Sequence, residues 1–254
     1  MKRFNDEIKN ILTKNENAAS CTIVETKGST PRKIGAKMIV YENGELFGTI
    51  GGGNLEKIVI KNAKIQIKAN KPKLFKHDLL HQHNMCCGGY VSIYIEPIVK
   101  NKRLYIFGAG HTGEALALYA SKMEFDTYII DDRKKYLDEI EIKGVSKVNV
   151  EFTKALPSLP FDENTFIAIM TYEHGFDRDI LSYCIKQPFA YLGMIGSNRK
   201  IALTRKIFLD GNIASDEELN KVDMPMGLDI KADGPHEIAI SILAKLIKVK
   251  NDLT

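Results

Sequence analysis

Hydrophobic positions in the first hundred residues follow the periods of short helices and strands. Apolar side chains recur at helical spacing between Arg3 and Lys14, and again over residues 54–69, which predicts two amphipathic helices. Asn43-Gly44 is typical of a tight hairpin turn, and Pro97 is expected to end the unit. Strands are expected at residues 21–26, 37–41, 46–50, 73–79 and 90–96. The pattern predicts an N-terminal α+β domain over residues 1–100.

From Lys102 onward the pattern changes to strands that alternate with helices. Strands are expected at residues 104–107, 127–130, 166–170 and 189–192, and helices at 114–122, 178–186, 199–209 and 236–248. Such alternation is typical of a Rossmann-like doubly wound domain with a mostly parallel sheet, here over residues 101–254. The fold class is therefore α/β. The pattern leaves open whether the last helix, 236–248, packs on this sheet or elsewhere.

Length, composition and charge narrow the class of protein. The 254 residues suit two modest domains, and no apolar run approaches the roughly 20 residues of a membrane span. Residues 1–7 lack an export signal, so we expect a cytoplasmic protein with no membrane partner. The formal net charge of +4 is spread along the chain and indicates no nucleic-acid partner. The four cysteines do not form a C-x-x-C pattern, so free thiols are expected.

One glycine-rich loop has the spacing of a dinucleotide fingerprint. The loop Gly108-Ala109-Gly110-His111-Thr112-Gly113 follows a predicted strand, opens a predicted helix and is answered by Asp131 at the end of the next strand. Backbone N–H groups at such a loop approach a pyrophosphate, and the carboxylate accepts from a ribose hydroxyl. Arg133 and two lysines stand close by, so the choice between NAD and NADP stays open. The alternative is a Rossmann fold whose nucleotide site is empty or reused.

Two further glycine turns precede predicted helices. Gly51, Gly52 and Gly53 stand directly before a helix that begins with Asn54 and Glu56, which would let a bulky ligand approach the backbone.

In the second turn, Gly196, Ser197 and Arg199 lie between a predicted strand and a predicted helix, where N–H groups and cations suit an anion. The alternative for the first turn is a purely structural connection, and for the second it is a helix cap.

Cys86, Cys87, Gly88 and Gly89 place two adjacent thiols beside a glycine turn. Exposed thiols there suit a soft ligand, whereas buried thiols would be inert. The thiols lie near three histidines, but the spacing fits no standard structural zinc site; these histidines are His77, His81 and His83.

His174 follows a predicted parallel strand. It is a candidate general acid or base, with helix capping as the alternative.

Taken together, the motifs resemble the XdhC/CoxI family of accessory proteins that mature molybdenum hydroxylases. The matching segments are Gly28-Ser29-Thr30-Pro31-Arg32, Gly48 to Glu56, Cys86 to Gly89, the Gly108 loop with Asp131-Asp132-Arg133, Gly193 to Lys200 and Pro225 to Ile230. The resemblance implies a chaperone that binds molybdenum cofactor (molybdopterin) and holds it while a cysteine desulfurase supplies a sulfido ligand. The protein then delivers the cofactor to an apo-molybdenum hydroxylase such as xanthine dehydrogenase. In that role it is a maturation factor more than a catalyst.

The resemblance also suggests roles for particular residues. Cys86 or Cys87 would approach the molybdenum or the incoming sulfur, Arg32 and the triple glycine would line the pterin, and the Ser197 turn would take a phosphate. The chain has Thr171-Tyr172-Glu173-His174 where family members often carry Thr-His-x-His, so only His174 and Asp177 can be tested there.

Two other classes of protein stay open. One is an NAD(P)-dependent oxidoreductase acting on a small molecule, and the other is a scaffold that recognises the hydroxylase through its surface. The client enzyme, a nucleotide extension of the cofactor and a homodimer also stay open.

Overall fold

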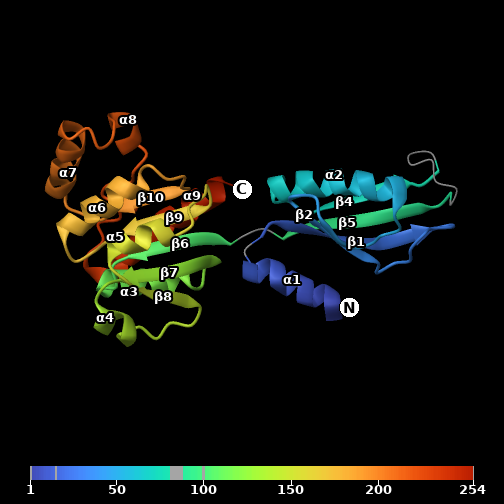
Figure 1. Ribbon diagram of the computed structural model, residues 1–254, viewed down its shortest axis with the longest axis horizontal. Coiled ribbons are helices and arrows are strands. Elements are labelled where there is room, and N and C mark those ends of the chain that lie inside the picture. Colours follow the sequence, from blue (N-terminus) through green and yellow to red (C-terminus); the bar gives the residue numbers. More distant parts are fainter. Residues whose placement is uncertain (1, 15, 81–87, 99–100, 254) are drawn as a thin grey trace. The chain divides into compact units, whose positions relative to one another are not determined.

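The computed structural model describes residues 2–14, 16–80, 88–98 and 101–253. The chain divides into two compact units, residues 1–100 and residues 101–253 (Figure 1). Within the described ranges, no helix combines the length and the apolar character that crossing a bilayer requires.

The first unit is an antiparallel sheet with one helix on each face. Its elements are α1 (Lys2–Lys14), β1 (Ala18–Lys27), β2 (Lys37–Tyr41), β3 (Leu46–Gly48), α2 (Gly53–Ala69), β4 (Lys73–Asp78) and β5 (Tyr90–Ile98). The strands are ordered β3-β2-β1-β5-β4. Leu55, Val59 and Ala63 of α2 pack on one face of the sheet, and Phe4 and Ile11 of α1 pack on the other (Figure 1).

The prediction that Pro97 ends the unit is wrong, because β5 continues through Pro97 to Ile98 and pairs with Ala18 and Ala19 of β1. Proline has no N–H to donate to a neighbouring strand. On its other side, β4 reaches only to the Lys73 and Ile95 pair, so the missing donor removes no hydrogen bond from that ladder.

The second unit is a five-stranded parallel sheet between two layers of helices. Its elements are β6 (Lys102–Phe107), α3 (His111–Ala120), β7 (Phe125–Asp131), α4 (Lys134–Glu139), β8 (Val145–Asn149), α5 (Phe152–Ala155), β9 (Thr165–Ile169), α6 (His174–Cys184), β10 (Tyr191–Met194), α7 (Asn198–Asp210), α8 (Asp216–Leu219) and α9 (Gly234–Asp252). The order β10-β9-β6-β7-β8, with every neighbour parallel, confirms the predicted Rossmann-like sheet. Its topological switch point lies between β6 and β9.

The last helix covers the α3 side of the parallel sheet. Ala239, Ile242 and Leu246 of α9 join the apolar cluster that contains Leu116 of α3 and Ile106 of β6. The opposite face is covered by α5, α6 and α7 through a second cluster.

The sequence pattern predicted wrong boundaries for some helices and strands of this unit. Helices α3 and α6 begin several residues earlier than predicted, at His111 and His174, because their first turns are polar and carry little periodicity. Strand β10 begins at Tyr191 and includes Gly193, which pairs with Ala168 of β9. Five short elements were not predicted, since each is too short for a clear period: α4, β8, α5, α8 and the 3-10 helix η1 (Leu156–Ser158).

Candidate functional site

Three glycine-rich segments of the first unit meet at one end of its sheet. A Cβ on Gly89 would lie 2.3 Å from the carbonyl oxygen of Ser29, and a Cβ on Gly51 would lie 2.7 Å from Cγ of Pro31. These contacts bring together the segments 28–32, 51–53 and 88–89. The antiparallel topology explains this meeting: β1 and β3 end where β2 and β5 begin. We call this group of loops the glycine site.

Glu56 holds the triple-glycine turn in place. Its Oε1 accepts from the hydroxyl of Thr49 at 2.6 Å and from the N–H groups of Ile50 at 3.0 Å and Gly52 at 2.9 Å. Burial by itself would raise the pKa of this carboxyl, but the hydrogen bonds from Thr49 and the glycine turn outweigh burial, so the pKa is lowered. The carboxylate therefore stays charged at the first turn of α2, where the helix dipole favours a negative group.

The backbone of the glycine site is open toward solvent. Gly51, Gly52 and Gly53 have φ values of 133°, 79° and 65°, which side-chain-bearing residues rarely adopt. No atom lies within 4 Å of where a Cβ on Gly52 or Gly53 would stand. Asn54 is exposed as the second residue of α2, and Arg32 beside the turn is exposed with no hydrogen bond or ion pair to its guanidinium within the described chain.

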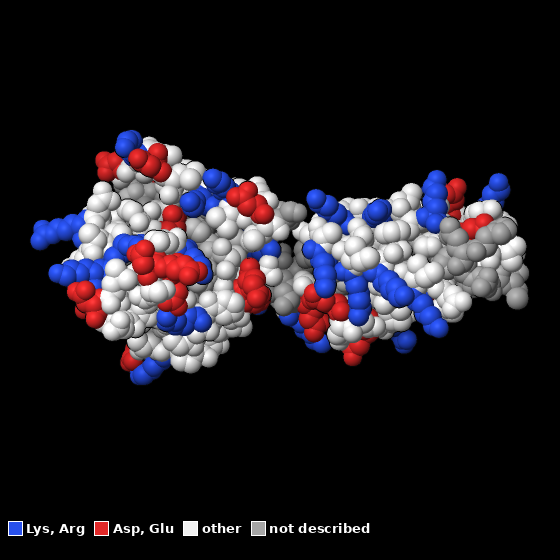
Figure 2. Space-filling model, turned by 90° about the horizontal axis from the view of Figure 1, so that it is seen from above, with Lys and Arg blue, Asp and Glu red and all other residues white. Residues whose placement is uncertain are grey.

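Helix α2 carries a lysine stripe on its outer face. Lys57, Lys61, Lys64 and Lys68 are spaced by four, three and four residues, which places them on one side of the helix. Figure 2 shows the basic side chains that gather over this side of the first unit. The stripe begins one turn after the glycine site, so an anionic ligand that approaches this turn meets positive potential.

The predicted thiols cannot be placed. Cys86, Cys87, His81 and His83 lie outside the described residues. A metal or sulfur role for them therefore stays a prediction. Gly88 is described, is exposed and has a φ of 62°.

Of the residues considered for a zinc site, only His77 lies within the described residues. His77 is buried in β4, and the part of the chain that the structure describes contains no group of three metal-ligating side chains. Cys21 and Cys184 are free and buried, and burial raises the pKa of each thiol to about 12, which makes them inert.

In the second unit, each glycine of the fingerprint does a different job. Gly108 has a φ of 115°, and a Cβ on it would lie 2.3 Å from the carbonyl oxygen of Met170, so this glycine permits the tight turn. A Cβ on Gly113 would lie 1.9 Å from the carbonyl oxygen of Gly108, so this glycine permits close packing of α3 on the sheet. Gly110, by contrast, faces open space. These are the three roles that a dinucleotide loop requires.

Asp131 lies at the end of β7, as predicted, but its carboxylate is buried and already engaged. It accepts from Ala109 N–H at 2.7 Å and binds the guanidinium of Arg133 through Nε at 2.9 Å and Nη2 at 2.8 Å. Burial would raise the pKa of Asp131, and the hydrogen bonds from Arg133 and Ala109 outweigh it, so the pKa is lowered. Ribose binding by Asp131 stays a prediction, and it would require Arg133 to move away.

Two tyrosines hold Arg133 in that position. Its guanidinium carbon lies 4.1 Å from the ring centroid of Tyr136 and 4.0 Å from that of Tyr172, so the cation is stacked between two aromatic faces. The hydroxyl of Tyr172 donates to Asp132 at 2.9 Å. Sequence reasoning missed both tyrosines, because nothing in the local pattern shows that they flank Arg133.

A cavity opens at the carboxyl ends of the strands, beside the first turn of α3. Its volume is about 400 Å³, and we call it the α3 cavity. It is lined by Gly110, His111, Thr112, Gly113, Arg133, Tyr136, Met170, Thr171, Tyr172, Ile195 and Pro235. The loops after β6, β7, β9 and β10 all contribute, as expected at the switch point of a doubly wound sheet.

A buried ion pair ties the ends of β9 and β10 together. Lys200 Nζ lies 2.5 Å from Asp177 Oδ2 and donates to the carbonyl oxygen of Ile195 at 2.9 Å. Asp177 also accepts from the hydroxyl of Thr171 at 2.7 Å. His174 lies beside this pair, with its Nδ1 3.9 Å from Asp177 Oδ2, but its side chain is 73% exposed.

The predicted anion turn opens helix α7. Ser197 caps the helix, since its hydroxyl accepts from Lys200 N–H at 3.3 Å. Arg199 is exposed in the first turn, and Gly196 leaves room for the Lys200 side chain, which a Cβ there would approach to 2.7 Å. The capping alternative is therefore satisfied, and a phosphate contact is compatible with the same geometry.

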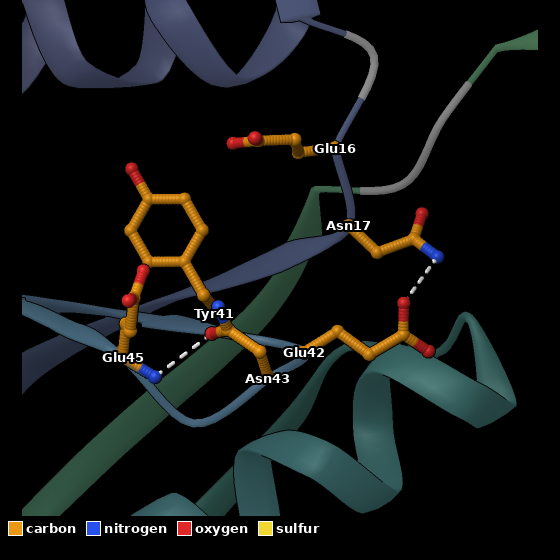
Figure 3. A pocket seen from close by; sticks show the side chains of 6 residues that line it. All are labelled: Glu16, Asn17, Tyr41, Glu42, Asn43 and Glu45. Carbon is orange, nitrogen blue, oxygen red and sulfur yellow. Dashed lines mark hydrogen bonds between the residues drawn. The ribbon is translucent and has the colours of Figure 1, made fainter.

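The first unit also contains an acidic cavity that the sequence pattern did not indicate. Its volume is about 380 Å³, and Figure 3 shows the side chains that line it: Glu16, Asn17, Tyr41, Glu42, Asn43 and Glu45. Asn17 donates to Glu42 at 2.9 Å. The hydroxyl of Tyr41 donates to Glu7. Burial is the larger cause of the raised pKa of this phenol, and the contact with Glu7 raises the pKa further. Three glutamates make this cavity unsuited to an anionic cofactor.

The fold defines a two-unit α/β protein whose second unit is a Rossmann domain. Residues 104–246 match the model of the XdhC Rossmann domain, and residues 11–78 match the model of the XdhC and CoxI family. The chain therefore belongs to the XdhC and CoxI family.

Three curated proteins are similar to this chain. The uncharacterized protein YqeB of Escherichia coli (strain K12) is 34% identical over 92% of this chain and 44% of its own length, so the chain spans less than half of YqeB. A probable xanthine dehydrogenase subunit from Bacillus subtilis (strain 168) is 20% identical over 98% of both chains. The molybdenum cofactor insertion chaperone PaoD of Escherichia coli (strain K12) is 20% identical over 94% of this chain and 85% of its own.

Among solved structures, a xanthine dehydrogenase from Bacillus halodurans has a similar fold. The TM-score is 0.53 at 22% identity, over 97% of this chain and 95% of the other.

Proposed function

We propose that the protein binds molybdenum cofactor and supports its insertion into a molybdenum hydroxylase such as xanthine dehydrogenase. The convergence of the segments 28–32, 51–53 and 88–89 into one open glycine site is the observation that carries this proposal. The similarity to a named insertion chaperone, PaoD, supports it.

The residues of the glycine site fit such a cofactor. Gly52 and Gly53 leave an open cradle, where a flat pterin can lie against the backbone without meeting a Cβ. The guanidinium of Arg32 has no hydrogen bond or ion pair among the described residues and can donate to the oxygens of an anionic ligand. The first turn of α2 adds the positive end of a helix dipole at the same loop. Glu56 would keep the turn in its open shape. When bound, the cofactor supplies a molybdenum centre and dithiolene sulfurs.

The finer part of the proposal concerns sulfur. Cys86 and Cys87 directly precede Gly88 in the chain, and Gly88–Gly89 belongs to the glycine site, so the thiols are tethered within two residues of it. A thiolate is a suitable neighbour for a soft metal or for sulfur supplied by a cysteine desulfurase. We propose that one of the two thiols approaches the molybdenum or the incoming sulfur before the hydroxylase takes the cofactor.

The test is the molybdopterin content of protein purified from a molybdate-fed host. Removal of the Arg32 guanidinium (Arg32→Ala) is expected to lower the content about tenfold, which corresponds to a lost charged hydrogen bond. Arg3→Ala removes the same charge from α1, on the other face of the sheet, and should leave the content unchanged.

Cys86→Ala and Cys87→Ala test the sulfur role separately, through the sulfuration of a reconstituted hydroxylase. Wild-type protein without any molybdopterin would overturn the binding proposal. Unchanged sulfuration in both cysteine variants would remove only the thiols.

An NAD(P)-dependent oxidoreductase is the second candidate, and the fingerprint glycines favour it. The open face at Gly110 would accept a pyrophosphate, but Asp131 is engaged by Arg133. A calorimetric titration with NAD⁺ and NADP⁺ tests this candidate, since micromolar binding of either would support it.

A further inference from the structure

Helices α6 and α7 bring basic side chains to one small cavity at the carboxyl edge of the parallel sheet. The cavity has a volume of about 190 Å³, and we call it the α7 cavity. It is lined by His174, Arg178, Ser197, Arg199, Lys200, Leu203 and Thr204. It shares no lining residue with the α3 cavity. Segments about twenty residues apart in sequence thus form one basic wall.

Among the described residues, the positive charge at the α7 cavity exceeds the negative charge that contacts it. Asp177 is the carboxylate in contact with it, and Asp177 is buried and bound to Lys200, whose side chain is 12% exposed. Arg178 and Arg199 have no hydrogen bond or ion pair within the described chain. Two guanidinium groups therefore face one cavity with no counter-ion from the part of the chain that the structure describes. Like charges that share one concave site repel one another until an anion enters.

Other groups at this wall also suit an anion. The first N–H groups of α7, a helix of thirteen residues, have no partner inside the helix, so the positive end of its dipole adds to the two guanidinium groups. The Ser197 hydroxyl already receives a hydrogen bond from Lys200 N–H, which leaves its own proton free for a ligand. His174 adds two ring nitrogens at the rim. Of the residues that line the cavity, all except the apolar Leu203 have a side chain that can donate a hydrogen bond.

We propose that the α7 cavity binds a phosphate monoester group. Two guanidinium forks can each bind an oxyanion through paired N–H groups, and a doubly charged phosphate matches two unpaired cations better than a carboxylate does. In this arrangement His174 donates to the ligand and is not a general base.

The phosphate has two chemical sources. It belongs either to a pterin that carries a phosphate, in which case the inference rests on the proposed function, or to a free mononucleotide.

The test is an isothermal titration of the full-length protein with inorganic phosphate and with AMP at low ionic strength. Arg178→Ala and Arg199→Ala are each expected to weaken phosphate binding about tenfold, and Arg199→Glu to abolish it. Lys206→Ala is the matched control, because Lys206 is an exposed cation on the same helix that does not line the cavity.

The molybdopterin content of the same variants identifies the source. A fall in both phosphate affinity and molybdopterin content assigns the site to the cofactor. A fall in phosphate and AMP affinity with unchanged molybdopterin content supports a separate nucleotide site and leaves the proposed function untouched. Phosphate affinities of Arg178→Ala and Arg199→Ala equal to that of Lys206→Ala, in variants with wild-type melting temperatures, would overturn the inference.

Discussion

Arg133 binds the buried carboxylate of Asp131 through two parallel hydrogen bonds, from Nε to Oδ1 at 2.9 Å and from Nη2 to Oδ2 at 2.8 Å. Both oxygens of the acid at the end of β7 are thus engaged within the protein. In a dinucleotide site this acid would face a ribose. Here the arginine two residues later takes that place and presents its remaining edge toward the α3 cavity.

The first prediction concerns the stability of this pair against acid. The pKa of Asp131 is lowered in the folded state, whereas an aspartate in the unfolded chain has a pKa of about 3.9. A depressed folded pKa contributes stability above the unfolded pKa, and that stability is lost as pH falls through the folded pKa. Asp131→Asn should therefore cost roughly 1–3 kcal/mol at pH 7. The difference in unfolding free energy from the wild type should shrink below about pH 4. Urea denaturation at pH 7 and pH 3 measures the cost of the substitution and its decrease in acid. An equal difference between wild type and variant at the two pH values would contradict the lowered pKa of Asp131.

The second prediction compares two glycines of one loop. Gly113→Ala would push a Cβ into the carbonyl oxygen of Gly108, 1.9 Å away, and should destabilise the protein by about 3 kcal/mol or more. Gly110→Ala meets no atom and keeps an ordinary φ of −73°, so it should cost less than about 1 kcal/mol. Thermal unfolding measures the two costs. Any nucleotide affinity of the α3 cavity should fall in Gly110→Ala while the melting temperature holds.

The third prediction tests whether Glu56 shapes the glycine site. Glu56→Gln keeps the size of the side chain but removes the charge that accepts from Thr49, Ile50 and Gly52, so stability should fall by roughly 1–2 kcal/mol. Molybdopterin content should fall with it. Glu45→Gln removes an exposed carboxylate of the same unit and serves as the control. Retention of wild-type stability and cofactor content in Glu56→Gln would show that the turn holds its shape without the charge.

The fourth prediction concerns the ion pair between Lys200 and Asp177. Lys200→Met leaves a fully buried carboxylate with Thr171 and the exposed ring of His174 as its neighbours and should cost about 3 kcal/mol. Lys206→Met removes an exposed charge from the same helix and should change stability by less than about 0.5 kcal/mol. A double variant with Asp177→Asn should recover part of the loss, because no buried charge is left alone. Additive costs in the denaturation midpoints would show that the two residues do not interact.

Much of this protein could be predicted from local sequence because short-range spacing fixes local backbone shape. The roles of Gly108, Gly110 and Gly113 follow from their spacing between a strand and a helix, since this spacing is the one that a dinucleotide loop requires. Helices α1 and α2 and the hairpin β2–β3 follow from hydrophobic period and from an Asn-Gly turn. The parallel direction of the strands in the second sheet follows from the alternation of strands with helices.

Contacts between distant segments were decided by the tertiary structure alone. The meeting of Ser29 with Gly89 and of Pro31 with Gly51 depends on which strand ends share one edge of an antiparallel sheet, and local spacing carries no signal for that edge. The same holds for Arg178 and Arg199, which reach one cavity from two helices. The sequence pattern placed Asp131 at the correct strand end. Its pairing with Arg133 depends on the burial of the carboxylate and on the two tyrosine rings that stack on the guanidinium. Local spacing determines backbone shape, whereas side-chain partners depend on packing between elements far apart in the chain.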